Sequence, residues 1–167
     1  MAALLPATYY QLQALMNPYA QQIIELYKHP LNFGKTEDAD IIKIGMNLSC
    51  GDQVSMYIKL KSQNSKVKNE SEELKVEIES ISFEGTGCSV SVASASLLTE
   101  TLKGKTLEEV LGWGMKEIEG MLGVEMGPSR LKCALLPLDT LQEGIREFKK
   151  QNAPVSPKGR AEAEKYK

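Results

Sequence analysis

The stretch of sequence from Leu74 to Leu102 decides the fold, and it reads LKVEIESISF-EGTGC-SVSVASASLLTETL. Its first ten residues alternate apolar and polar side chains, which is the period of a half-buried β-strand. The alternation ends at Phe83, and Gly85 and Gly87 then interrupt the chain. From Ser89 onward, small residues recur among apolar ones, which predicts a helix that packs closely on its neighbours. We therefore predict a strand, a short turn and a helix.

Upstream of this stretch, the same alternation occurs once more. Gln53–Lys61 places four apolar side chains on one face, so we expect it to pair with the strand at 74–83 in antiparallel fashion. Ile41–Asn47 is a short apolar strand or extended segment before it. Two or three strands joined in this way form a meander with one covered face. Because packed helices follow the strands without βαβ alternation, the predicted fold class is α+β.

Helical spacing of apolar residues predicts further helices before and after the strands. One covers Tyr9–Tyr27 and is expected to restart at Pro18, since proline suits the first turn of a helix. Another begins after Thr106, whose capping box with Glu109 marks a helix start, and its apolar stripe extends to Leu122.

The last helical pattern covers Arg130 to about Lys150 and contains Pro137. A proline has no N–H to bond the carbonyl four residues earlier, which here belongs to Cys133. The helix is therefore predicted to kink at this point or to start anew near Leu136.

Length and composition limit the classes of protein to which this chain can belong. The 167 residues suit one domain, predicted over residues 1–150, and the apolar-poor stretch 151–167 is expected to be a mobile tail. A net charge of -2 argues against a nucleic-acid binder, and no apolar run has the length of a membrane span. The start of the sequence lacks the features of a signal peptide. We expect a cytoplasmic protein that binds neither nucleic acid nor membrane and whose thiols stay reduced.

The chain has three cysteines, Cys50, Cys88 and Cys133, a count that fits small buried residues as well as a functional site. Their positions favour a site. Each is predicted to lie at the end of a strand or helix, beside glycine or a break, where ligand sites collect. Gly51 permits a tight turn from which Cys50 and Asp52 both reach inward.

The chemistry of these positions indicates a soft-metal or reactive-thiol site. Cys88 and Cys133 are predicted at helix N-termini, where the macrodipole favours thiolate, and Lys132 or Arg130 adds positive charge near the third cysteine. Three thiolates and Asp52 make four ligands, enough for tetrahedral zinc or a small iron–sulfur cluster. A carboxylate holds iron less tenaciously than sulfur, which suits a site that releases its cargo. The spacing of the cysteines matches no zinc finger.

At these positions the sequence resembles the IscU/SufU/NifU N-terminal family of iron–sulfur cluster assembly scaffolds. The resemblance implies a three-stranded antiparallel sheet packed by helices on one side, with Cys50, Asp52, Cys88 and Cys133 as the functional ligands. The stretches that carry it are His29–Gly34, Asn47–Asp52, Phe83–Cys88, Ser91–Ser96 and Arg130–Ala134.

Two departures refine the resemblance. The IscU branch has a histidine before its third cysteine, whereas this chain has Lys132, which is closer to SufU; the insertion usual in SufU between the second and third cysteines is, however, absent. The Leu-Pro-Pro-Val-Lys chaperone-binding stretch of the IscU branch is replaced by Met126–Arg130, so the resemblance does not extend to hand-off by that chaperone.

Two functions follow as expectations. In the first, the chain is a scaffold or carrier, not an enzyme, that assembles a transient 2Fe–2S cluster from iron and the sulfur of a cysteine desulfurase and passes it to acceptor apoproteins. In the alternative, it is a zinc-dependent sulfurtransferase in which Cys50 accepts persulfide sulfur from the desulfurase. A purely structural zinc domain fits less well, because structural sites are closed by sulfur and nitrogen rather than by a carboxylate.

Overall fold

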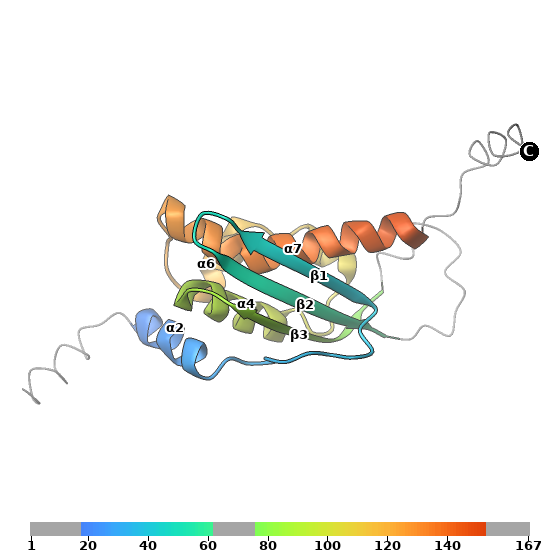
Figure 1. Ribbon diagram of the computed structural model, residues 1–167, viewed down its shortest axis with the longest axis horizontal. Coiled ribbons are helices and arrows are strands. Elements are labelled where there is room, and N and C mark those ends of the chain that lie inside the picture. Colours follow the sequence, from blue (N-terminus) through green and yellow to red (C-terminus); the bar gives the residue numbers. More distant parts are fainter. Residues whose placement is uncertain (1–17, 62–75, 153–167) are drawn as a thin grey trace, which may run out of the picture.

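In the part of the chain that the structure describes, one helix precedes three consecutive strands and four helices follow them. Figure 1 shows their arrangement. The computed structural model describes residues 18–61 and 76–152. The predicted start of the first helix before Pro18 and the tail at 153–167 lie outside these residues. The elements are α2 (Pro18–Lys28), β1 (Ile41–Asn47), β2 (Asp52–Leu60), β3 (Ile78–Thr86), α4 (Ser89–Thr101), α5 (Leu107–Leu111), α6 (Met115–Leu122) and α7 (Pro128–Asn152).

The strands form one antiparallel sheet in the order β1-β2-β3. This confirms the predicted α+β class and the meander. The register pairs Asn47 with Asp52 across the first hairpin and Gln53 with Thr86 between β2 and β3. Because of these two pairings, the β1–β2 loop and the residues that follow β3 lie side by side at one end of the sheet.

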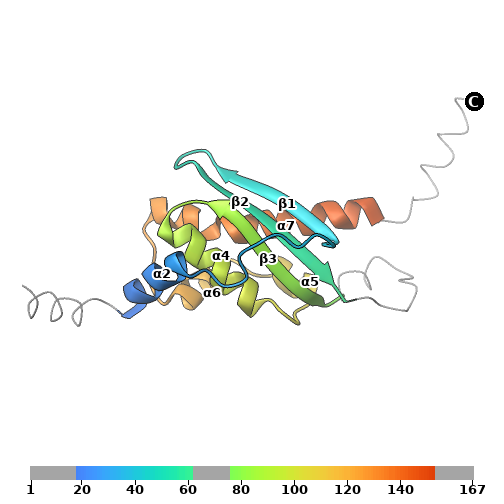
Figure 2. The same cartoon turned by 60° about the horizontal axis from the view of Figure 1, so that its bottom comes forward.

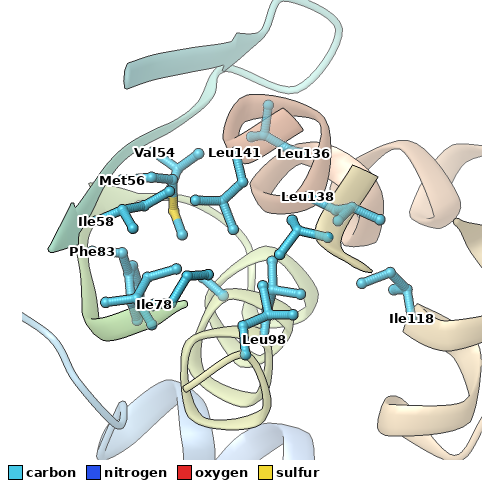
Figure 3. Close-up of a cluster of buried hydrophobic side chains, with 14 of the residues drawn as sticks. Val54, Met56, Ile58, Ile78, Phe83, Leu98, Ile118, Leu136, Leu138 and Leu141 are labelled. Carbon is cyan, nitrogen blue, oxygen red and sulfur yellow. The ribbon is translucent and has the colours of Figure 1, made fainter. Parts of the chain in front are cut away.

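Helices α4 and α7 pack against the sheet and against each other (Figure 2). The alternating strand residues supply one side of the core, and helix residues such as Leu98, Leu138 and Leu141 supply the other (Figure 3). Helix α7 lies very close to β1, since a Cβ added at Gly45 would overlap the Thr140 hydroxyl. This close approach fixes α7, and with it Cys133, relative to the hairpin that carries Cys50.

The stripe from Thr106 to Leu122, predicted as one helix, forms two. The predicted capping box between Thr106 and Glu109 is present at the start of α5, but the helix ends at Gly112. Gly114 then has an extended backbone (φ -153°, ψ -154°), and its N–H donates to the Glu117 side chain at 2.7 Å, which starts α6. The two glycines end one helix and begin another because neither resists leaving the helical conformation.

The last helix does not restart near Leu136. Helix α7 is continuous from Pro128 to Asn152 with Pro137 inside it, so residues 151–152 belong to the helix and not to a tail. Pro137 is itself buried, as are Leu136 and Leu138 on either side. Packing on the sheet thus offsets the one backbone bond that the proline removes. Pro18 is the first residue of α2, as predicted. Among the described helices, none combines the length and apolar content needed to cross a membrane.

Candidate functional site

The three cysteines and Asp52 meet at one end of the molecule. Figures 1 and 2 show the β1–β2 loop beside the first turns of α4 and α7 at the end where α2 also lies. Asp52 is the first residue of β2, and Cys88 immediately precedes α4. Because Gln53 pairs with Thr86, the next residues outward, Asp52 and Gly87, come together. Sheet register therefore places the first two predicted ligand segments in contact.

Cys50 and Cys133 form the tightest pair of the site. Their Sγ atoms lie 3.4 Å apart. One carboxylate oxygen of Asp52 lies close to both, since the three ligand atoms are all within 4.8 Å of one another. Cys50 is exposed on the hairpin loop, whereas Cys133 and Asp52 are buried. Two thiols and a carboxylate oxygen thus face one small volume that is open to solvent on the side of Cys50.

One carboxylate oxygen of Asp52 accepts a hydrogen bond, and the other has no partner among the described residues. Its Oδ1 accepts the backbone N–H of Cys88 at 3.1 Å. Its Oδ2 is buried and accepts no hydrogen bond from any residue that the structure describes. An unsatisfied buried carboxylate oxygen is costly, and a cation removes that cost. The donor set of two sulfurs and a carboxylate oxygen therefore fits a soft or borderline metal ion.

Gly87 makes room for this carboxylate. A Cβ at position 87 would lie 3.1 Å from Asp52 Cγ and 3.2 Å from Ser91 Oγ, closer than nearly all real Cβ contacts. The absence of a side chain at position 87, in the turn before Cys88, thus leaves room for the side chain of Asp52. From the sequence alone, Gly87 is recognised only as an interruption between the strand and the helix.

Cys88 lies at the start of α4, where the sequence predicted a helix N-terminus, and it is the N-cap residue of that helix. Its Sγ accepts the backbone N–H of Ser91 at 3.5 Å, which is a capping bond made by sulfur in place of oxygen. The thiol is exposed and lies outside the close group formed by Cys50, Asp52 and Cys133, but on the wall of the same cavity. It is near enough to Cys133 to act on the charge of that thiol.

The prediction that a helix N-terminus favours thiolate at Cys133 is wrong. Cys133 is the sixth residue of α7, beyond the first turn, and it is 7% exposed. Burial raises the pKa of its thiol well above the ordinary value, and the neighbouring Cys50, Cys88 and Asp52 raise it further. The site gathers acidic groups, and a bound cation would be the natural counter-charge that makes this thiol a thiolate.

The two basic residues expected to assist Cys133 differ in position. Arg130 lines the cavity beside the cysteines, whereas Lys132 is exposed and is not among the lining residues. Cys133 hydrogen-bonds instead with Asn47, whose Nδ2 lies 3.7 Å from its Sγ, and with the Ser129 carbonyl oxygen at 3.8 Å. The proximity of Asn47, at the end of β1 and 86 positions away, could not be read from the sequence.

The thiols open into a cavity of about 600 Å³. Its other walls are mainly apolar and come from α2, from the start of α4 and from the loop before α7. The role of α2 was missed by sequence reasoning, because its apolar stripe is the same whether the helix covers the core or a site. The apolar lining residues are Ala20, Ile23, Ile24, Val90, Val124 and Met126.

Similarity to known proteins agrees with this geometry. Residues 18–154 match the family described as NifU-like N terminal domain. The chain is 31% identical to the zinc-dependent sulfurtransferase SufU of Bacillus subtilis (strain 168) over 144 residues, covering 76% of this chain and 88% of that protein. It is also 31% identical to the iron-sulfur cluster assembly scaffold protein IscU 1 of Archaeoglobus fulgidus over 137 residues, covering 82% of this chain and 80% of that protein.

A solved structure supports the same assignment. The crystal structure of a protein from Fervidobacterium islandicum AW-1, assigned as an iron–sulfur cluster assembly scaffold for the SUF system, aligns with a TM-score of 0.55 and 29% identity. The alignment covers 74% of this chain and 93% of that one. The resemblance predicted from the cysteine motifs is thereby confirmed, and the chain belongs to the NifU-like N-terminal domain family.

Proposed function

We propose that this chain is an iron–sulfur cluster assembly scaffold that binds iron and desulfurase-derived sulfur on Cys50, Asp52, Cys88 and Cys133. The observation that carries the proposal is the carboxylate of Asp52. Its Oδ2 is buried without a hydrogen-bond partner among the described residues, and one of its oxygens lies within 4.8 Å of two thiols that are 3.4 Å apart. Such a group is poorly satisfied in the metal-free protein and is suited to iron. The bound cluster is cargo, passed to acceptor apoproteins in the cytoplasm.

The openness of the site supports transfer rather than permanent storage. Cys50 and Cys88 are exposed, and both line the cavity together with Cys133. A donor that delivers sulfur and an acceptor that removes the cluster can therefore approach the same thiols. In this proposal the donor is a cysteine desulfurase, and the apolar wall from α2 lies where such partners would contact the chain.

Anaerobic reconstitution tests the scaffold. The purified chain is incubated with ferrous iron, cysteine, a cysteine desulfurase and a thiol reductant, which supplies the electrons that convert persulfide sulfur to sulfide. Bound iron, acid-labile sulfide and visible absorption are then measured. We expect iron and sulfide in equal amounts and transfer of the cluster to an apo-ferredoxin. Cys50→Ser, Cys88→Ser and Cys133→Ser should each reduce the bound cluster, whereas Ile44→Ala, on the exposed face of β1, should not. Stable zinc at one ion per chain with no cluster would contradict the proposal.

A zinc-dependent sulfurtransferase is the second candidate, favoured by the position of Cys50. This thiol is exposed and precedes Gly51, whose φ of 76° places the loop in a conformation that suits glycine. If Cys50 leaves the metal, Asp52, Cys88 and Cys133 remain to hold it. The free thiolate attacks the outer sulfur of the desulfurase persulfide, the S–S bond breaks, and Cys50 becomes the persulfide while the desulfurase regains its thiolate.

Desulfurase stimulation separates the two candidates. The zinc-loaded chain is mixed with a cysteine desulfurase, and sulfide production is followed with and without a thiol reductant. The sulfurtransferase predicts a faster desulfurase and an added sulfur on Cys50 by peptide mass spectrometry, both lost in Cys50→Ala. An unchanged rate in Cys50→Ala would remove Cys50 from this role.

A further inference from the structure

We propose that Asn47 is a positioning residue of this site that shapes the loop carrying Cys50 and tunes the sulfur of Cys133. The inference rests on the proposed binding of a metal or cluster by these thiols. Asn47 is the last residue of β1 and pairs with Asp52, so it lies directly behind the loop. Its main chain and both ends of its side-chain amide hydrogen-bond within the site.

The main chain and the side-chain oxygen of Asn47 fold the loop. Its carbonyl oxygen accepts the N–H of Gly51 at 2.8 Å and that of Cys50 at 3.3 Å. Its Oδ1 accepts the N–H of Ser49 at 3.1 Å, which makes an Asx turn. Three successive N–H groups of the loop thus bond to one residue, and they set the direction from which Cys50 enters the site.

The bond to Ser49 also fixes which way the amide faces. A backbone N–H can only donate, so the amide atom opposite Ser49 must be the oxygen. The amide nitrogen is then turned toward Cys133, where Nδ2 lies 3.7 Å from Sγ and donates to it. This donor reaches the most buried of the three thiols.

The N–H donors are distributed unequally over the three sulfurs. Cys88 accepts from the Ser91 N–H, and Cys133 accepts from Asn47. Within residues 18–61 and 76–152, no N–H donates to Cys50, whose Sγ instead faces the Asn47 carbonyl oxygen at 4.0 Å. A donated N–H withdraws electron density from a ligand sulfur and changes the electronic properties of the bound metal. Asn47 therefore makes Cys133 the weaker donor and leaves Cys50 the more electron-rich thiolate.

Two substitutions separate the turn from the N–H···S bond. Asn47→Ser keeps a short oxygen acceptor for the Ser49 N–H, because serine forms the equivalent turn, but it offers no N–H to Cys133. Asn47→Ala removes both. Each variant is loaded with Co²⁺ in place of the native metal, and the thiolate-to-cobalt charge-transfer band and the affinity are measured. Circular dichroism of the metal-free proteins checks folding, and Ile44→Ala serves as the β1 control.

We expect the charge-transfer band to shift to lower energy in both variants, since a sulfur without its N–H holds its electrons less tightly. Affinity should fall about tenfold in Asn47→Ala, the usual effect of losing an outer-sphere partner, and less in Asn47→Ser. A folded Asn47→Ser protein with the band of the unmodified chain would overturn the tuning role, and unchanged affinity in Asn47→Ala would overturn the positioning role. Absence of any charge-transfer band in the unmodified chain would instead contradict the proposed function.

Discussion

The Sγ atoms of Cys50 and Cys133 lie 3.4 Å apart, although 83 positions separate the two residues in the sequence. Cys50 belongs to the loop between two strands and Cys133 to the helix that packs beneath them. Their proximity is a product of the tertiary fold. An experiment that detects this proximity therefore tests the geometry of the site.

Mild oxidation should join this pair. A disulfide needs its sulfurs about 2.05 Å apart, and the exposed loop at Gly51 can supply the small movement required. We expect diamide, which takes up the two hydrogens lost by the thiols, to form an intramolecular Cys50–Cys133 disulfide in the metal-free protein. Peptide mapping by mass spectrometry identifies it.

Matched variants test which cysteines form the disulfide. Cys88→Ser should still form the disulfide, Cys133→Ser should not, and prior loading with zinc should protect both thiols. A disulfide that includes Cys88 instead would contradict the observed pairing.

Gly87→Ala should weaken metal binding while leaving the fold intact. The new methyl group would lie 3.1 Å from Asp52 Cγ and must displace the carboxylate that faces the thiols. We expect affinity to fall about tenfold, as for other changes next to metal ligands, and the free energy of unfolding to change by less than about 1 kcal/mol. Competition with a chromophoric chelator measures the affinity.

Gly127→Ala is the control for this change. Gly127 also lines the cavity, but a Cβ there meets nothing within 4 Å. If both alanine variants lose affinity equally, crowding of Asp52 is not the cause.

Replacement of Asp52 should prolong the life of a reconstituted cluster. Its carboxylate is the one oxygen among the proposed ligands, and oxygen holds iron less firmly than sulfur. We expect slower cluster loss from Asp52→Ala, followed by visible absorption after an acceptor is added. Asp52→Asn should behave similarly while keeping an acceptor for the Cys88 N–H, which separates ligand loss from disruption of the turn.

Asp38→Ala provides the charge control, because Asp38 is an exposed carboxylate whose ion pair is with Lys59. Equal or shorter cluster lifetime in Asp52→Ala would contradict the role of the carboxylate in release.

Alkaline pH should destabilise the metal-free protein through Cys133. Burial raises the pKa of this thiol in the folded chain above its ordinary value of 9.0, so the unfolded chain releases the proton first. Below pH 9 the thiol is protonated in both the folded and the unfolded chain, so the free energy of unfolding does not depend on its titration. Above pH 9 the free energy of unfolding falls by about 1.4 kcal/mol per pH unit. Urea unfolding between pH 7 and 10 measures the loss.

Cys133→Ala isolates the contribution of this thiol from other groups that titrate in the same range. The difference in unfolding free energy between the two proteins should change with pH only at the alkaline end. Parallel curves would show that Cys133 does not hold its proton more firmly in the folded chain.

Features set by neighbours in the sequence were predicted well. The place of Cys88 at a helix N-terminus, the capping box of Thr106 with Glu109 and the alternating strands all depend on residues a few positions apart. Asp52 was recognised as a candidate because it follows Cys50 across a single glycine. These signals are local, so one sequence contains them.

Features set by packing were not predicted. The environment of Cys133 depends on the position of α7 along β1. The close contact between Gly45 and Thr140 fixes that position. The continuity of α7 through Pro137 depends on which residues the core buries. The bond from Asn47 to Cys133 joins a hairpin to a helix whose relative position no local pattern specifies.

The three cysteines lie far apart along the chain. Cys50 and Cys88 are 38 positions apart, and Cys88 and Cys133 are 45 apart (88 − 50 and 133 − 88). An ion held by all three closes two long loops at once, so it acts as a reversible cross-link between the hairpin, α4 and α7. Loading and emptying the site then change the resistance of the whole chain to unfolding, and thermal melting or limited proteolysis can distinguish filled molecules from empty ones.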